Sequence, residues 1–450
     1  MDERHALSWL YSFADWERGV GWNARASPDP AWNLERTRHF LDLAGGPDRT
    51  LICILIAGTK GKGSSAAMVE SIARAAGART GLYTQPHLHH YRERIRLNGE
   101  PIGGGDFASL ATRLRPLVNR LVHDLPAAGE PTTFEITTAM ALAAFADFGV
   151  DVAVLEVGLG GRLDATNVVQ PTVSAITRIS YDHTQILGRT LGAIAREKAG
   201  ILRSGVPMVS APQRAAAHEA LVRAARAVGA PHRFVEPFPP GRGEPSRGWR
   251  QPVQVVFRGQ TAGVAWLPLL GDHQRENAAL AVAACEELTD AKLLSVGPAA
   301  VRGGLEAVRW PGRLEVVDES PLMVVDGAHN GESAERLAAA LGKCFSFSRL
   351  WLVVGLLRDK DARAFLRPLV PLAAGVVATR TSSRRALEPG ELAQACRAAG
   401  ARRVETAPDV PTALTLARSW ADPTDLICAT GSLSVVAEAR PPLPLLRGRG

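Results

Sequence analysis

The sequence contains few cysteines and no long apolar run. Its 450 residues include only five cysteines, which are scattered and form no CxxC pair: Cys53, Cys285, Cys344, Cys396 and Cys428. This spacing argues against a disulfide framework or a cysteine-based zinc site and favours reduced thiols. No apolar run is long enough to span a bilayer, and the N-terminus has charges of both signs without a small-residue cleavage site. We therefore expect a cytoplasmic protein without a signal peptide or membrane segment.

Basic runs interleaved with aromatic residues are also missing, although the chain carries a formal charge of +7, with 52 Lys and Arg against 45 Asp and Glu. A positive balance suits anionic ligands such as nucleotides or carboxylates. Because the sequence has no basic run interleaved with aromatic residues, we do not favour a nucleic-acid-binding protein. Such a protein would bind oligonucleotides with a strong dependence on salt concentration.

Short apolar runs alternate with amphipathic helical stretches, which predicts an α/β protein with parallel sheets covered on both faces. A first series is interrupted by a predicted hairpin within 231–270, and a second, smaller series begins near Trp310. We predict a first domain over 1–298 and a second over 309–450. The strands are expected at 51–57, 151–157, 173–179, 206–210, 322–326, 350–355, 375–379 and 425–429. The helices are expected at 64–76, 106–122, 135–147, 190–203, 214–228, 275–288, 333–342, 361–369, 390–399 and 411–420.

A glycine loop, GTKGKG, lies between the first predicted strand and a helix. Glycines let main-chain N–H groups approach phosphate oxygens, the helix N-terminus adds partial positive charge, and Lys62 adds a full one. The alternative is a tight turn that happens to contain glycine. The loop differs from the usual P-loop because Gly63, not Ser or Thr, follows the lysine, and Ser64 comes one position later. Another oxygen must then complete a magnesium site.

Polar residues also follow other predicted strands. Glu156 ends one strand, and Asp182 and His183 come just after the next. The carboxyl ends of parallel strands border the ligand crevice, where a carboxylate is suited to Mg²⁺. Asp326 likewise ends a strand of the second domain, and His329 follows it. Taken singly, each also fits an ordinary capping turn.

Lys198 and Arg313 complete the set of singled-out side chains. Lys198 lies near the end of a predicted helix, where a lysine is usually a solvated partner of the helix dipole. Arg313, in WPGRLE, could contact a nucleotide or amino acid from the second domain.

Nine ordered motifs resemble the folylpolyglutamate synthase/dihydrofolate synthase family, a branch of the Mur-type amide ligases. They run nearly end to end: AGTKGKGSSAAM, PHLHHYRERIRLNGEPI, TFEITTAMALAAFA, EVGLGGRLDATNVV, the segment 182–202, LLGDHQRENAALA, WPGRLEVV, VVDGAHN and GSLSVVAE. The resemblance implies a parallel-sheet P-loop-type ATPase domain of the Mur ligase central type with a folate pocket. It also implies a smaller Rossmann-like C-terminal domain on the amino-acid side.

The resemblance also implies roles for individual residues. Lys62, Lys198 and His329 would be catalytic. The ATP contacts would be Lys60, Gly61, Lys62, Gly63, Ser64, Asn277, Arg313 and Asp326. The pterin pocket would contain Thr133, Phe134, Leu163, Asp164 and Ala165. The Mg²⁺ ligands would be Gln85, Glu156, His183 and Lys198, the last as a carbamate.

Two positions depart from the family pattern. The family loop usually reads GTNGKGS, whereas Lys60 stands here in place of Asn and adds charge beside the phosphates. The family segment before PHL usually supplies a serine ligand to Mg²⁺, whereas this chain has Gln85, which has a longer side chain. Altered substrate choice or reduced activity would follow from a rearranged metal site.

The resemblance implies ATP-dependent ligation of L-glutamate to dihydropteroate or folyl-polyglutamate through an acylphosphate, with ATP and Mg²⁺, in a monomer without nucleic-acid or membrane partners. One alternative is a Mur-type ligase that acts on a different carboxylate. Another is a non-catalytic ATP-binding relative, which would bind nucleotide without amino-acid-dependent release of ADP.

Overall fold

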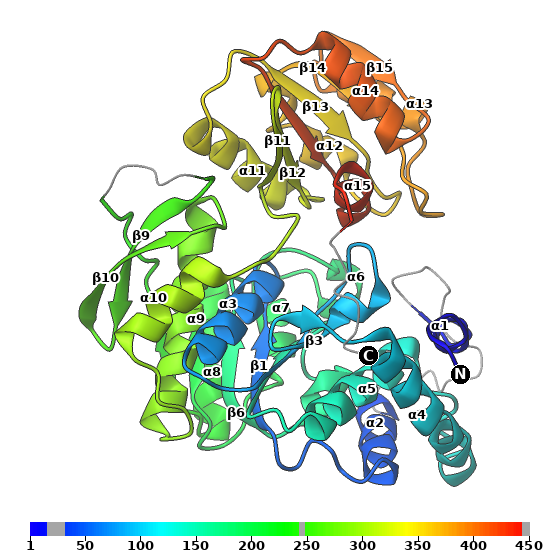
Figure 1. The fold of residues 1–450 in the computed structure, drawn as a ribbon, viewed down its shortest axis with the longest axis vertical. Helices are drawn as coiled ribbons and strands as arrows, with labels where there is room; N and C mark the ends of the chain where they lie inside the picture. Colours follow the sequence, from blue (N-terminus) through cyan, green and yellow to red (C-terminus); the bar gives the residue numbers. More distant parts are fainter. Residues whose placement is uncertain (16–31, 243–247, 443–450) are drawn as a thin grey trace.

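The structure is a computed structural model and describes residues 1–15, 32–242 and 248–442. The described residues form two lobes, each built on its own sheet (Figure 1). We call the described residues up to 307 the N-terminal lobe and those from 312 to 442 the C-terminal lobe. Figure 1 shows the C-terminal lobe, coloured yellow to red, lying beyond one end of the larger N-terminal lobe.

The N-terminal lobe contains an eight-stranded sheet in the order β4-β3-β2-β5-β1-β6-β7-β8. Its strands are β1 (Ile52–Ala57), β2 (Thr80–Tyr83), β3 (Ile95–Leu97), β4 (Glu100–Pro101), β5 (Val152–Glu156), β6 (Pro171–Ile176), β7 (Met208–Ser210) and β8 (His232–Phe234). All neighbours pair in parallel except β2 with β3 and β3 with β4. Strands β9 (Gln251–Phe257) and β10 (Gln260–Leu267) form the predicted antiparallel hairpin.

The helices of this lobe are α1 (Glu3–Leu10), α2 (Trp32–Leu43), α3 (Lys62–Ala75), α4 (Gly104–Asp124), α5 (Thr133–Asp147), α6 (Thr184–Leu187), α7 (Leu191–Ala199), α8 (Ala215–Val228), α9 (Asp272–Asp290) and α10 (Pro298–Ala307). Short 3₁₀ helices span Tyr91–Arg94 and Ala165–Val168. Helix α10, which starts where the first predicted domain ends, packs against α3 and β10.

Strand β1 is buried on both faces of the sheet. Its alternate side chains Cys53 and Leu55 belong to one buried apolar cluster, and Ile54 and Ile56 belong to another on the opposite face. Helices α4, α5, α7 and α8 supply the first cluster, and α3, α9 and α10 supply the second. Because both faces are covered, β1 has no solvated side and reads as a continuous apolar run. The prediction of a parallel, doubly covered sheet is confirmed.

The C-terminal lobe has a six-stranded sheet in the order β11-β12-β16-β13-β14-β15, parallel except for β11. Its strands are β11 (Glu315–Glu319), β12 (Leu322–Asp326), β13 (Leu350–Val354), β14 (Ala373–Ala378), β15 (Val404–Thr406) and β16 (Leu426–Thr430). Its helices are α11 (Gly331–Cys344), α12 (Ala362–Leu366), α13 (Pro389–Ala398), α14 (Val410–Trp420) and α15 (Leu433–Ala439), and a 3₁₀ turn spans Val370–Leu372.

Three neighbouring strands position the site. Strand β1 lies between β5 and β6, so the loop after β1 is flanked by the residues that follow β5 and β6. Strand β12 of the other lobe ends facing the same region, because residues from 326 to 329 line the same cavity as this loop. Within residues 1–15, 32–242 and 248–442, no helix is both long and apolar enough to cross a membrane.

Candidate active site

The loop between β1 and α3 has the geometry of an anion site. Gly61 is the N-cap of α3 and adopts a φ of 91°, which favours glycine, and α3 begins directly at Lys62. The first N–H groups of a helix have no partner within it, so they remain available to a phosphate. Lys62 Nζ lies 4.0 Å from Glu156 Oε1 and is mostly shielded from solvent. The loop therefore offers main-chain N–H donors and the ammonium group of Lys62 to the same ligand.

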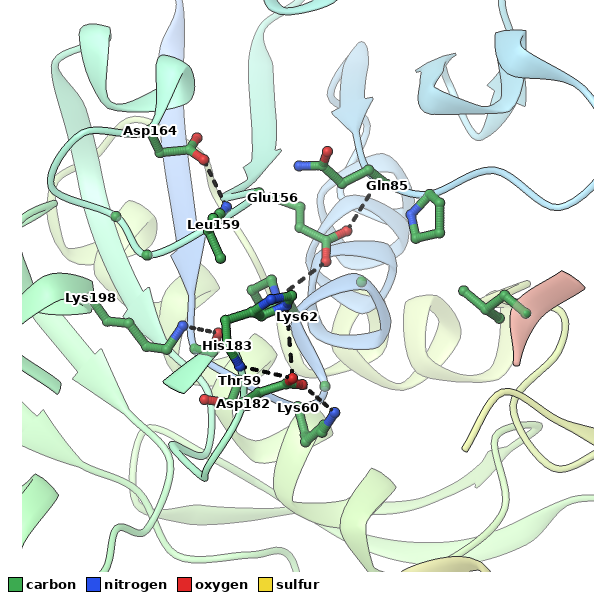
Figure 2. Close-up of a pocket in the computed structure, with 18 of the residues that line it drawn as sticks. Thr59, Lys60, Lys62, Gln85, Glu156, Leu159, Asp164, Asp182, His183 and Lys198 are labelled. Carbon is green, nitrogen blue, oxygen red and sulfur yellow. Dashed lines mark hydrogen bonds and ion pairs between the residues drawn. The ribbon is translucent and has the colours of Figure 1, made fainter. Parts of the chain in front are cut away.

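Glu156 and Gln85 meet at the end of β5. The Glu156 carboxylate is buried and accepts a hydrogen bond from the main-chain N–H of Gln85 at 3.2 Å. Figure 2 shows the Gln85 carboxamide on the side of Asp164, away from this contact. A Cβ placed on Gly158 would lie 2.6 Å from Gln85 Nε2 and 3.0 Å from Asp164 Oδ2. Here the main chain of Gln85 faces the carboxylate, and its carboxamide lies beside the predicted acceptor pocket.

Asp164 anchors that pocket. Its carboxylate accepts hydrogen bonds from the N–H groups of Leu159 at 2.9 Å and Thr166 at 3.0 Å, and from the Thr166 hydroxyl at 2.6 Å. Burial raises the pKa of Asp164, while these donors oppose the rise. Phe134 stacks on Tyr83 with ring centroids 6.1 Å apart. An aromatic face beside a buried carboxyl group suits a flat heterocycle with hydrogen-bonding edges.

Thr133 has a structural partner as well. Its hydroxyl donates to the carbonyl of Leu10 at 3.0 Å and so ties α5 to the end of α1. Leu163 and Ala165, also predicted for the pterin pocket, line the cavity beside Asp164.

Lys198 on α7 is buried beside the phosphate loop, unlike a solvated partner of a helix dipole. Its Nζ donates to the carbonyl of Gly58 at 2.7 Å. Burial, together with the positive charge of Lys62, lowers the pKa of Lys198 to about 7. A large fraction of this amine is therefore neutral near neutral pH.

Asp182 and His183 flank the loop on the side opposite Glu156. His183 adopts a φ of 48° and is half-exposed, with its Nε2 3.8 Å from Asp182 Oδ1. Burial, only partly opposed by Asp182, lowers the pKa of His183 to about 4, so the imidazole is neutral and able to ligate a cation. In the described part of the chain, no three His, Cys, Asp or Glu side chains already form a cation cluster.

The C-terminal lobe contributes Arg313, Asp326 and His329. Asp326 ends β12 and accepts hydrogen bonds from the N–H groups of Leu314 and Ala328, both at 2.8 Å. Burial lowers the pKa of Arg313, although the neighbouring Asp326 opposes this. His329 Nε2 lies 3.1 Å from Lys60 Nζ, across the boundary between the lobes.

All of the predicted site residues line one cavity of about 760 Å³ between the lobes. Asn277 reaches it from α9, and its Nδ2 donates to Gln274 Oε1 at 2.9 Å. The residue predictions had omitted Gln274, His273 and Arg336, which also line it. The first two lie in the segment LLGDHQRENAALA, so the motif was a sufficient signal for them, whereas Arg336 on α11 belongs to none of the nine motifs.

The chain matches two family models, the Mur ligase middle domain over 56–210 and the Mur ligase glutamate ligase domain over 312–433. It is 34% identical to a Bacillus subtilis dihydrofolate synthase/folylpolyglutamate synthase, over 90% of this chain and 94% of that one. A solved Mycobacterium tuberculosis folylpolyglutamate synthase complexed with ADP and AMPPCP aligns over all of both chains with a TM-score of 0.85 and 35% identity. A structure described as an FPGS–AMPPCP–folate complex aligns over 97% of this chain and 98% of that one, with a TM-score of 0.82 and 29% identity. The chain therefore belongs to the folylpolyglutamate synthase/dihydrofolate synthase family of Mur-type ligases.

Proposed function

We propose that this protein joins L-glutamate to dihydropteroate, to folyl-polyglutamates or to both, at the expense of ATP, giving ADP and phosphate. The carrying observation is one interlobe cavity that contains a phosphate loop, a buried carboxyl and aromatic pocket, and polar side chains from the second lobe. The similarity to proteins named folylpolyglutamate synthase supports the same reaction. Solved structures of such proteins include complexes with ADP, AMPPCP or folate.

The acceptor's carboxylate attacks the γ-phosphorus of ATP in line, so an acylphosphate forms and ADP leaves. Lys62 and the N–H groups at the start of α3 stabilise the charge on the transferring phosphoryl group. Asn277 and Arg313 hold the nucleotide from opposite lobes, with Asp326 orienting Arg313. The glutamate amine then attacks the acyl carbon, and phosphate leaves. Enclosure between the lobes keeps water from the acylphosphate.

The predicted ligands of Mg²⁺ lie around the phosphate loop and include the oxygen donors that a hard cation prefers. Glu156 offers a carboxylate and His183 a neutral imidazole on either side of the phosphate loop. Gln85, another predicted ligand from this lobe, has its carboxamide nitrogen beside Gly158, on the side of the acceptor pocket. When bound, Mg²⁺ neutralises charge on the phosphates.

We further propose that Lys198 is carbamylated. The neutral amine attacks CO₂, a C–N bond forms and one proton is released. The product keeps one N–H, which can still donate to Gly58, and gains an anionic oxygen donor for a cation. The depressed pKa supports this, because only the neutral amine reacts. Mass spectrometry of the intact native protein, with and without bicarbonate, should show a reversible gain of one CO₂ that a Lys198→Met variant lacks.

The deciding assay measures ADP release with Mg·ATP and glutamate, comparing 7,8-dihydropteroate, tetrahydrofolate and no acceptor. Release that requires both acceptor and glutamate establishes the ligase, and the better acceptor identifies the dominant activity. Lys62→Met should lower the rate by about 10²–10³-fold, the usual loss for one charge-stabilising donor. Lys343→Met, an exposed lysine outside the cavity lining, serves as the control. ATP binding without acceptor-dependent release would contradict the proposal.

A Mur-type ligase acting on another carboxylate is the second candidate, and the carboxamide of Gln85 beside Asp164 favours it. A panel of alternative carboxylic acids in the same assay separates the two. We also expect a monomer, which light scattering on the purified protein checks.

A further inference from the structure

The two lysines of the phosphate loop point to different partners. Lys62 lies near Glu156, inside the N-terminal lobe. Lys60 Nζ donates to Asp182 Oδ2 at 2.8 Å, as Figure 2 shows, and also lies 3.1 Å from Nε2 of His329 in the other lobe. Only 13% of the Lys60 side chain and 15% of the Asp182 side chain are exposed. The ammonium group of Lys60 therefore joins the two lobes in a largely shielded place.

The tautomer of His329 makes this contact a hydrogen bond. His329 Nδ1 lies 2.9 Å from the carbonyl of Gly327, and a carbonyl only accepts, so Nδ1 carries the proton. Burial and the charge of Lys60 both lower the pKa of His329, so the ring is neutral. Nε2 then has a free lone pair, and the Lys60 ammonium donates to it. The 3.9 Å between Nε2 and Asp182 is too long for a hydrogen bond.

Asp182 supplies the opposite charge at this crossing. Its carboxylate accepts the hydrogen bond from the Lys60 ammonium at 2.8 Å, and 15% of the side chain is exposed. Asn330 Nδ2 lies 3.5 Å from the same carboxylate and forms a second, weaker contact between the lobes. A carboxylate, an ammonium group and an imidazole thus form one chain from the loop after β6 of the N-terminal lobe to the loop before α11 of the C-terminal lobe.

A different ion pair crosses the same boundary in solvent. Lys343 Nζ lies 2.6 Å from Asp272 Oδ2, but 63% and 55% of these side chains are exposed. Water and salt screen such a pair, so it adds little to the association of the lobes. It is a matched control for Lys60, because it has the same charges and spans the same lobes.

We propose that Lys60 is a positioning residue that holds His329, and with it the C-terminal lobe, over the phosphate loop. The kinetic consequence rests on the proposed function, whereas the contact itself needs no substrate. Lys62 then serves the phosphates while Lys60 serves the lobe interface. The asparagine usual in the family at this position has no charge with which to make the same link.

The first test uses the ligand-free full chain. Small-angle scattering and amide hydrogen exchange are compared for the unmodified protein and the variants Lys60→Met, Lys60→Arg and Lys343→Met. Lys60→Met should increase the radius of gyration and speed exchange in residues 327–333 by about tenfold, the effect of losing one coupled contact. Lys60→Arg keeps the charge and should restore most of the protection. Lys343→Met should match the unmodified protein.

The second test is kinetic. Lys60→Met should raise the KM for ATP by about tenfold with a smaller change in kcat, because fewer molecules have the lobes in place. Asp182→Asn removes the charge partner and should reproduce the exchange and scattering effects if Lys60→Met fails to fold. Unchanged scattering and exchange in either folded variant would overturn the proposal. A protein without ligase activity would defeat the proposed function alone, since the first test needs no turnover.

Discussion

Gly61 lies directly against the side chain of Asn277, so a Cβ at position 61 would overlap Asn277 Oδ1. The contact joins the start of α3 to α9, two helices that pack together on the same face of the sheet. Gly61 is therefore required both for its φ of 91° and for the space beside Asn277. A second glycine of this chain allows these two requirements to be separated by experiment.

Gly77 provides the comparison, because its φ is also 91° and a Cβ there would meet nothing within 4 Å. Gly61→Ala and Gly77→Ala should each lower the free energy of unfolding by about 1–2 kcal/mol, the cost of a left-handed backbone in an L-residue. Only Gly61→Ala displaces Asn277 and the loop, so it should also weaken ATP binding by more than about tenfold, a loss of more than about 1.4 kcal/mol. Urea unfolding and calorimetric titration with a non-hydrolysable ATP analogue measure the two quantities. Equal affinity of the two variants for the ATP analogue would show that the position of Asn277 does not depend on the space beside Gly61.

Gln85 can be assigned to the acceptor or to the metal by one substitution. Because its carboxamide lies beside Gly158 and Asp164, Gln85→Ser should change the KM for the acceptor by about tenfold, the scale of one pocket contact. The Mg²⁺ concentration at half-maximal rate should stay the same, since the main-chain N–H that faces Glu156 is kept. Paramagnetic Mn²⁺ titrations in the presence of the ATP analogue give a second readout. A weaker cation affinity with unchanged acceptor KM would place Gln85 at the metal.

Arg36 and Glu135 form the most deeply buried ion pair that we describe, with 1% and 3% of the side chains exposed. Arg36 donates to both carboxylate oxygens, at 2.6 and 2.9 Å, and to the carbonyl of Ala128. Arg36→Met leaves the carboxylate buried without its cation and should cost about 3–5 kcal/mol of unfolding free energy.

Two controls accompany this prediction. Adding Glu135→Gln to Arg36→Met should recover part of the loss, because the amide keeps the size of the carboxylate without its charge. Arg113→Met breaks an ion pair with Asp147 that is about half exposed, and it should cost less than about 1 kcal/mol. Urea unfolding of the four proteins is the measurement. Similar losses for Arg36→Met and Arg113→Met would mean that solvent reaches the Arg36 pair.

The strand-associated residues were the predictable part of the site. Glu156 and Asp326 end strands, and Lys62 opens a helix after a glycine loop, so a few neighbouring residues fix where each side chain lies. The apolar runs likewise predicted the main strands of both sheets. Strand β2 was missed because its four residues, TGLY, are too few to show a period.

Contacts between distant segments were not predictable in this way. Lys60 and His329 are 269 positions apart, and their hydrogen bond depends on how the two lobes meet. Arg36 and Glu135 are 99 positions apart, and neither residue type suggests burial. The sequence pattern suggested a solvated Lys198, but α7 packs so that its last turn faces the phosphate loop. Local periodicity contains no information about any of these three arrangements.

Lys198 predicts a specific pH dependence of stability. Its pKa is about 7 in the folded protein and 10.5 when unperturbed, so between these values the unfolded chain binds more protons than the folded one. Stability contributed by this residue must therefore rise with pH, by up to about 1.4 kcal/mol per pH unit in that window, and level off above it. Below pH 7 both states are protonated, and the full penalty of burying the ammonium group applies. The measurement is urea unfolding from pH 6 to 10 in CO₂-depleted buffer, taken as the difference between the unmodified protein and Lys198→Met. A difference that does not change with pH would show that the amine is already carbamylated or is exposed to solvent, and the mass of the intact native protein separates these, because the carbamate adds the mass of one CO₂.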